Sequence, residues 1–260
     1  MKPEPVSEFG DWAAPSEDFN LGEGQVHVWR LQLDAPEERI VALRALLSPE
    51  ELARADRFLR HKHRRRFANV HGLLRLILAE YTEVAPKAIQ FQTNEFGKPF
   101  LAPETSVEFN LSHSGDLALV ALTTGRAIGV DLEQYRERLE TEKISKRYFS
   151  SAEFSQLMNL PDSQREEAFY ACWTRKEAYI KARGEGLSLG LDRFDVAFIP
   201  NAPPALLHSD ENSEEVNRWS FIDLKLQPRY AAACVVEGRI HELRRWDARE
   251  LNPSHDSSPG

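Results

Sequence analysis

The sequence predicts an α+β fold of two similar lobes, each a small, mainly antiparallel sheet packed on a long helix. Each half of the 260-residue chain contains one long helical pattern and about three strand-like segments. This length suffices for one large domain or two small ones. Matching content in the two halves favours two lobes lying side by side, although no repeat of individual residues relates them.

The chain divides into four parts. Residues 1–24 are an acidic, proline-containing lead-in, and residues 25–125 form the N-terminal lobe. Residues 126–250 form the C-terminal lobe, and the boundary between the lobes falls in the polar stretch near residues 124–126. The composition of residues 251–260 predicts a disordered tail.

The N-terminal lobe opens with a strand and several helices. Residues 25–33 alternate apolar and polar side chains, which predicts a strand. Residues 36–47 indicate a short helix, and the capping box at 48–51, with Pro49 in the first helical position, predicts another. The long helix is predicted from apolar residues spaced three or four apart: Phe67, Val70, Leu74, Ile77 and Tyr81.

Strands complete the N-terminal lobe. A short strand is expected at 89–92, before a tight bend at Gly-Lys-Pro, residues 97–99. Residues 107–112 and 117–122 predict two strands of a hairpin with a polar tip.

The C-terminal lobe repeats this layout. A strand at 127–133 precedes a charged helical region at 137–149 and a helix that begins near Ser151. The long helix spans 166–182, and Gly184 suits the left-handed position that ends a helix. Three further strands are expected, at 193–199, 219–226 and 230–236. Residues 201–217 predict a surface loop.

Composition excludes several classes of protein. The net charge of −8 argues against a generalised nucleic-acid binder. No apolar run reaches the length of a membrane span, and the N-terminus lacks the apolar core of a signal peptide. We therefore expect a cytoplasmic protein with no membrane or nucleic-acid partner. Cys172 and Cys234 lie in apolar surroundings, which predicts buried, reduced thiols.

Three carboxylates are candidates for a metal site. Asp131 and Glu133 lie on one face of a predicted strand, where they repel each other unless a cation or a proton lies between them. Glu177 on the second long helix supplies a third carboxylate, and an all-oxygen set suits Mg²⁺ or Mn²⁺. The alternatives are two solvated acids, and a simple ion pair between Glu177 and Lys181.

Hydroxyl and basic side chains are candidates for phosphate binding. His113, next to Ser112 at a strand end, can donate to a phosphate oxygen, act as a base or be a solvated loop histidine. Lys98 lies on the Gly-Lys-Pro bend, which is not a Walker loop. The basic run at 54–66 indicates a local anion site or the solvated face of a helix.

Four of these segments resemble signatures of the 4′-phosphopantetheinyl transferases, specifically the larger surfactin-synthetase-activating (Sfp) type. Gly-Val-Asp-Leu-Glu at 129–133 resembles G-(I/V)-D-x-E, and Trp-Thr-Arg-Lys-Glu-Ala-Tyr-Ile-Lys at 173–181 resembles W-x-x-K-E-(A/S)-x-x-K. Phe-Asn-Leu-Ser-His-Ser at 109–114 and Gly-Lys-Pro at 97–99 are similar to two further segments, in the same order along the chain. The resemblance covers residues 25–240.

The resemblance implies lobes related by a pseudo-twofold axis with the active site between them. It also implies that the 4′-phosphopantetheine arm of coenzyme A is transferred to a serine hydroxyl of an apo carrier protein, releasing adenosine 3′,5′-bisphosphate. The resemblance does not name the carrier, which could come from fatty-acid, polyketide or nonribosomal-peptide synthesis. A monomer is expected because one chain supplies both halves of the site.

The resemblance also assigns roles to individual residues. Asp131, Glu133 and Glu177 would hold Mg²⁺, or Mn²⁺. Contacts to coenzyme A would come from Lys98, Asn110, Ser112, His113 and Lys181, with the 3′-phosphate taken by Arg54, Lys62 and Arg66. The catalytic candidates are Glu177 as first choice of base with Glu133 second, Lys181 as a charge stabiliser, and His113.

Two other functions would also use these residues. A metal-dependent phosphodiesterase or nuclease needs three carboxylates and a basic run, but no carrier protein. A non-catalytic module that binds coenzyme A or an adenine nucleotide would show no turnover.

Overall fold

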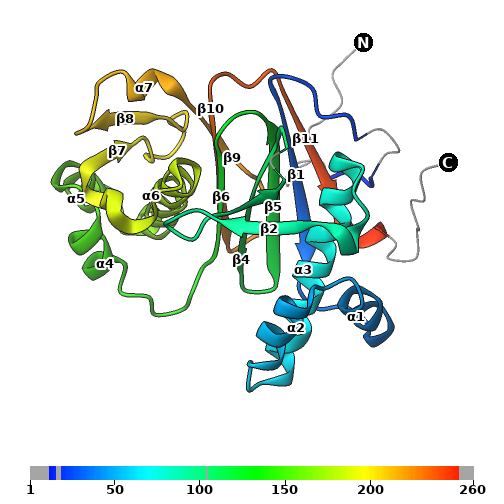
Figure 1. Ribbon diagram of the computed structural model, residues 1–260. Coiled ribbons are helices and arrows are strands. Elements are labelled where there is room, and N and C mark those ends of the chain that lie inside the picture. The colour runs from blue at the N-terminus through cyan, green and yellow to red at the C-terminus, as the bar shows by residue number, and fades with distance from the viewer. Residues whose placement is uncertain (1–11, 16–18, 104, 252–260) are drawn as a thin grey trace, which may run out of the picture.

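The structure confirms an α+β fold of two lobes. A computed structural model describes residues 12–15, 19–103 and 105–251. Two sheets lie at the centre, with α3 (His61–Thr82) on one side and α6 (Asp162–Arg183) on the other (Figure 1). The disordered tail predicted for 251–260 falls outside the described residues except for Leu251, and much of the lead-in does as well.

Each lobe is built around one main sheet. The first sheet has the order β11 (Glu242–Asp247), β1 (Gln25–Gln32), β5 (Leu117–Thr124), β4 (Val107–Ser114). The second is antiparallel, in the order β6 (Ile128–Gln134), β10 (Tyr230–Glu237), β9 (Trp219–Asp223). Two small pairs are β2 (Gln90–Thr93) with β3 (Pro99–Ala102), and β7 (Phe194–Val196) with β8 (Leu206–Ser209).

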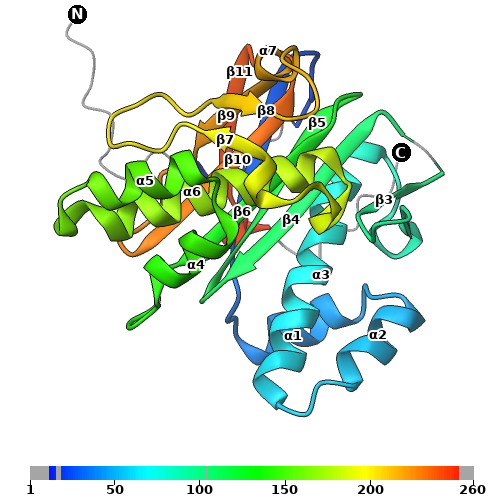
Figure 2. The same cartoon turned by 90° about the vertical axis from the view of Figure 1, so that its left-hand side faces the viewer.

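The remaining helices flank the two long ones. In the first lobe they are α1 (Glu37–Arg44) and α2 (Pro49–Asp56), which pack beside the start of α3 (Figure 2). In the second lobe they are α4 (Thr141–Tyr148), α5 (Ser151–Asn159) and α7 (Glu215–Arg218). Within the described residues, short 3₁₀ turns lie at Pro86–Ala88, Gly186–Leu189, Leu191–Arg193 and Ala248–Glu250. No helix in the described ranges is long and apolar enough to cross a bilayer.

The sheets and long helices stack as four layers. Side chains of β5 point alternately to two cores, because successive residues of a strand face opposite sides. Leu119 packs with Val130 between the two sheets. Val120 packs with Ile77 of α3 on the outer face of the first sheet. Val235 lies in a third core between the second sheet and α6.

Local signals in the sequence predicted several boundaries correctly. The predicted capping box of Ser48 with Glu51 starts α2, and a second one, Ser150 with Glu153, starts α5 where a helix was expected near Ser151. The predicted hairpin is β4–β5. Gly184 ends α6 with a left-handed φ of 72°.

Other elements depart from the predictions. β11 pairs in parallel with β1, so a strand from residues 126–250 lies in the sheet of the N-terminal lobe. The predicted loop at 201–217 contains β8 and most of α7, and β3 was not expected. These strands are short, or they are polar and lie at the edge of a sheet. Their sequences therefore show only weak alternation of apolar and polar residues, the pattern that predicts a strand.

Gly129 allows α6 to approach β6. A Cβ atom at this position would overlap the carbonyl oxygen of Ala178 and the amide nitrogen of Ala182, both in the backbone of α6. Neither atom can move without moving the helix. The Gly in the Gly-Val-Asp-Leu-Glu segment is therefore required by packing, and it sets the distance between β6 and α6.

We predict that Gly129→Ala costs about 3 kcal/mol or more of unfolding free energy, because overpacking against backbone has no side-chain relief. Chemical denaturation would measure the loss. Gly22→Ala is the matched control, since its Cβ would meet only the flexible side chain of Gln25. Equal stability of the two variants would contradict the close-packing account.

Candidate active site

Two carboxylates project from β6 toward α6. Asp131 and Glu133 lie on the same face of the strand as Gly129, the residue in contact with α6. Asp131 is only 4% exposed, and Glu133 is half-buried. The shared face expected from their spacing is thus directed at the second long helix.

Lys181 of α6 connects three elements. Its Nζ donates to Oδ1 of Asp131 at 2.6 Å and to Oγ of Ser112 at 3.0 Å. The ammonium therefore links α6 to β6 and β4. Its ion pair is with Asp131, and the alternative of an isolated pair with Glu177 does not describe this arrangement.

Glu177 has an unusual acidity. Burial raises the pKa of its carboxyl from 4.5 to about 7, and repulsion by Asp131 adds to the rise. Lys181 opposes the shift and Glu133 adds to it, so all four groups interact. Burial also raises the pKa of Glu133. A carboxyl that titrates near neutrality is suited to exchange a proton during catalysis.

The three carboxylates have the chemistry of a Mg²⁺ site but are not a preformed cage. Oδ2 of Asp131 is buried and has no hydrogen-bond partner among the described residues. Such an atom, beside two acids with raised pKa values, suits a hard cation. Within the described ranges, however, no three His, Cys, Asp or Glu side chains converge as metal ligands. The donor set fits the ion, and the side chains would have to draw together around it.

Polar side chains of β4 contact this group. Oδ1 of Asn110 accepts the Val130 amide at 2.8 Å, and Oγ of Ser112 lies 3.1 Å from Oδ1 of Asp131. Two of the predicted coenzyme A contacts, Asn110 and Ser112, therefore hold β6 and its carboxylate. Neither is exposed, at 5% and 7%.

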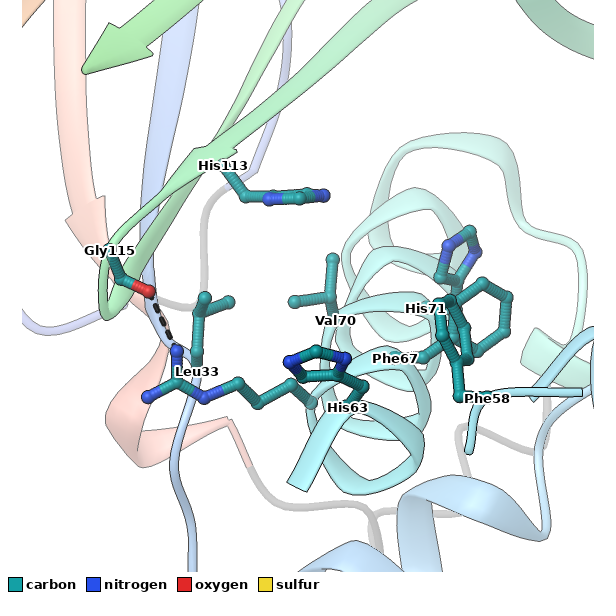
Figure 3. A pocket seen from close by; sticks show the side chains of 9 residues that line it. Leu33, Phe58, His63, Phe67, Val70, His71, His113 and Gly115 are labelled. Carbon is teal, nitrogen blue, oxygen red and sulfur yellow. Dashed lines mark hydrogen bonds between the residues drawn. The ribbon is translucent and has the colours of Figure 1, made fainter. Parts of the chain in front are cut away.

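His113 lies on the opposite face of β4 and lines a pocket of about 310 Å³. Figure 3 shows it facing His63, Val70 and His71 of α3 across the pocket. Burial lowers the pKa of His113, and Lys181 and His71 lower it further, so the imidazole is neutral at pH 7. A neutral imidazole offers one N–H to a phosphate and becomes a stronger partner on protonation.

The residues predicted to bind the 3′-phosphate are dispersed. Arg66 lines the histidine pocket but forms ion pairs with Asp34 and Asp116. Arg54 is exposed and stacks over Phe67. Lys62 is also exposed, so only Arg66 of this set lies at the pocket.

Lys98 lies at the junction of the two lobes. Its Nζ donates to the carbonyl oxygens of Ile128 at 3.0 Å and Ala182 at 3.2 Å. Burial lowers the pKa of its ammonium. Lys98 also lines a pocket of about 280 Å³ together with Glu177 and Lys181, so it borders the carboxylate group.

Of the histidines that line the first pocket, His63 belongs to the basic run predicted at 54–66, whereas His71 was not among the predicted site residues. His63 and His71 line it with His113 and lie four residues on either side of Phe67. That spacing puts all three side chains on one face of α3, a signal that was present in the sequence.

Lys176 of the Trp-to-Lys segment has a different role from its neighbour Glu177. It is fully buried, pairs with Glu153 at 2.7 Å and donates to the carbonyl oxygens of Leu191 and Phe194. Glu153 in turn accepts the Val196 amide at 2.9 Å. The pair anchors α6 to α5 and β7, and it is structural.

The fold and these groups define a two-lobed α+β enzyme with an acidic site beside a histidine-lined pocket. The sequence model of the 4′-phosphopantetheinyl transferase superfamily matches residues 127–235, and that of the N-terminal region of a 4′-phosphopantetheinyl transferase matches residues 34–125. The chain belongs to the 4′-phosphopantetheinyl transferase superfamily. The predicted family and enzyme class are thus confirmed, and the protein transfers phosphopantetheine to carrier proteins.

Two similar proteins, HetI and Sfp, agree with this family. The 4′-phosphopantetheinyl transferase HetI of Nostoc sp. is 39% identical over 238 residues, 90% of this chain and 97% of that protein. The 4′-phosphopantetheinyl transferase Sfp of Bacillus subtilis is 31% identical over 171 residues, 65% of this chain and 75% of that protein. A solved structure of the Thermotoga maritima holo-acyl-carrier-protein synthase (AcpS) is 25% identical, with a TM-score of 0.35, and covers 44% of this chain and 63% of that chain.

Glu177 should make the protein less stable as pH rises. Its carboxyl is protonated in both states below about pH 4.5, and the unfolded chain ionises first between pH 4.5 and about 7. In that pH range the folded state keeps a proton that the unfolded chain has released. Ionisation therefore favours the unfolded chain, and the free energy of unfolding falls by up to about 3 kcal/mol. Thermal unfolding in EDTA from pH 4.5 to 8 should show this loss in the wild type and a smaller one in Glu177→Gln. Parallel curves for the two proteins would refute the raised pKa.

Proposed function

We propose that the protein transfers the 4′-phosphopantetheine group of coenzyme A to a serine hydroxyl of an apo carrier protein and releases adenosine 3′,5′-bisphosphate. The observation that carries the proposal is the meeting of Asp131, Glu177 and Lys181 where β4, β6 and α6 adjoin. This group combines a candidate base, a cation and an orphaned carboxylate oxygen. These are the parts that a phosphoryl transfer needs.

The carrier serine is a weak nucleophile and must lose its proton. Glu177, with a pKa of about 7, is partly ionised at neutral pH and is the proposed base. The serine oxygen forms a bond to the phosphorus that carries the pantetheine. The bond from that phosphorus to the bridging oxygen of the pyrophosphate breaks, and adenosine 3′,5′-bisphosphate leaves with this oxygen. Glu133 is the second choice of base.

Charge on the pyrophosphate must be neutralised as the bridging oxygen leaves. Asp131, Glu133 and Glu177 are the proposed holders of Mg²⁺, or Mn²⁺, and the bound ion supplies this neutralisation. Lys181 adds a fixed positive charge beside Asp131. Ser112 limits the movement of both by contacting each of them.

Coenzyme A is a long polyanion, and the site offers hydrogen-bond donors and basic side chains on both faces of β4. His113 and Arg66 border one pocket, and Lys98 and Lys181 border the other. We place the phosphate-bearing part of coenzyme A across this strand. Both lobes of one chain contribute, which favours a monomer, and the protein's net charge of −8 argues against nucleic acid as a substrate.

A mass-shift assay tests the reaction. Incubation with Mg²⁺, coenzyme A and a panel of apo fatty-acid, polyketide and peptide carriers should increase the carrier mass by one phosphopantetheine group. We predict that Asp131→Ala and Glu177→Gln each lower the rate at least about 100-fold, because a base and a charge clamp each contribute that much.

The same assay separates the rival functions. Hydrolysis of nucleotides without carrier modification would indicate a phosphodiesterase. Coenzyme A binding without any turnover would indicate a binding module. Wild-type rates in either variant would contradict the proposed base and metal site.

His113 should affect binding of coenzyme A more than the chemical step. We predict that His113→Ala raises KM for coenzyme A roughly tenfold to hundredfold, the value of a hydrogen bond to a charged group, with a smaller change in kcat. Steady-state kinetics would measure both constants. His208→Ala is the control, because His208 is an exposed residue of β8 paired with Asp210. A change confined to kcat would place His113 in the chemical step instead.

A further inference from the structure

The two main sheets adjoin at strands that are not paired with each other. β4 is the last strand of the first sheet, and β6 is the first strand of the second. In the described part of the chain, no main-chain ladder joins them. An edge strand leaves backbone N–H groups that need other partners when they are buried.

Side chains of β4 supply those partners. Asn110 and Ser114 lie four residues apart on one face of the strand. Oδ1 of Asn110 accepts the Val130 amide, and Oγ of Ser114 accepts the Gln134 amide at 3.1 Å. These contacts hold β6 along β4 at the level of the acidic residues.

The Ser114 hydroxyl has a second partner, Glu133. A hydroxyl has a single proton, and here its oxygen already accepts from the backbone of Gln134. The proton is therefore directed to Oε2 of Glu133, which lies 2.8 Å away. Arg136 also approaches this oxygen, at 3.8 Å, but its side chain is 68% exposed. Ser114 is thus the close, anchored contact of the Glu133 carboxylate.

Ser112, two residues before Ser114 on the same face of β4, makes a similar pair of hydrogen bonds. It accepts from Lys181 and donates to Asp131. The two hydroxyls differ in what orients them: Ser112 is oriented by the side chain of Lys181, whereas Ser114 is fixed by a main-chain amide. A hydroxyl held by backbone imposes one orientation on its carboxylate whatever the state of Lys181.

We propose that Ser114 is a positioning residue, which holds the Glu133 carboxylate in the orientation needed to bind the divalent cation. This role rests on the proposed function for the cation itself. Groups that hydrogen-bond to metal ligands typically change metal affinity or activity tenfold to hundredfold when they are removed. Ser114 acts through Glu133 and does not itself touch the substrate.

Mn²⁺ binding to the protein without coenzyme A or carrier tests the role directly. Titration of free Mn²⁺ by electron paramagnetic resonance should give Ser114→Ala a Kd about tenfold to hundredfold weaker than that of the wild type. Ser114→Thr keeps the hydroxyl on a strand, where threonine is favoured, and should stay within about threefold of wild type. Melting temperatures of all variants, measured without Mn²⁺, exclude general loosening of the strands.

Ser220→Ala is the matched control. Its hydroxyl donates to the carbonyl oxygen of Gly238 at 2.7 Å, away from the acidic residues, and Mn²⁺ affinity should not change. An unchanged Kd in Ser114→Ala, or equal losses in the alanine and threonine variants, would overturn the positioning role alone. A wild-type protein that binds no Mn²⁺ would overturn the proposed metal dependence and the positioning role together.

Discussion

The close contact between β6 and α6 at Gly129 is the constraint on which the site depends. The backbone of α6 lies against this residue, so side chains two and four positions further along the strand must face the helix. Those side chains are Asp131 and Glu133. A bulkier residue at 129 would separate the two elements and move Glu177 away from its acidic neighbours, so a packing requirement and a chemical one meet at one glycine.

Bringing three carboxylates together in a partly buried site is unfavourable, because they repel one another. Neighbouring groups reduce this repulsion. Lys181 neutralises Asp131, Ser112 and Ser114 donate to the two carboxylates of β6, and Glu177 is left with a raised pKa. Burying groups of like charge lowers the stability of the folded state. Proteins retain such groups where their function requires them. A cation bound between these groups would relieve the repulsion.

The segment at 173–181 combines structural and chemical residues in one helix. Trp173 packs in the aromatic core with Phe149 and Phe169, and Lys176 closes a buried ion pair with Glu153. Glu177 and Lys181 instead face β6. Removing one partner of a buried pair commonly costs 3–5 kcal/mol, so loss of activity on changing Lys176 would report unfolding and not chemistry.

Local sequence determined the capping boxes, both long helices, the β4–β5 hairpin and the shared face of Asp131 and Glu133. Each of these features depends only on neighbouring residues and on the periodicity of a strand or a helix. Only the tertiary structure decided what lies far apart in the chain. It placed β11 beside β1, paired Lys181 with Asp131, directed Arg66 to Asp34 and Asp116, and set Ser114 against Glu133. Such partners are chosen by the packing of whole elements, and no local pattern contains that information.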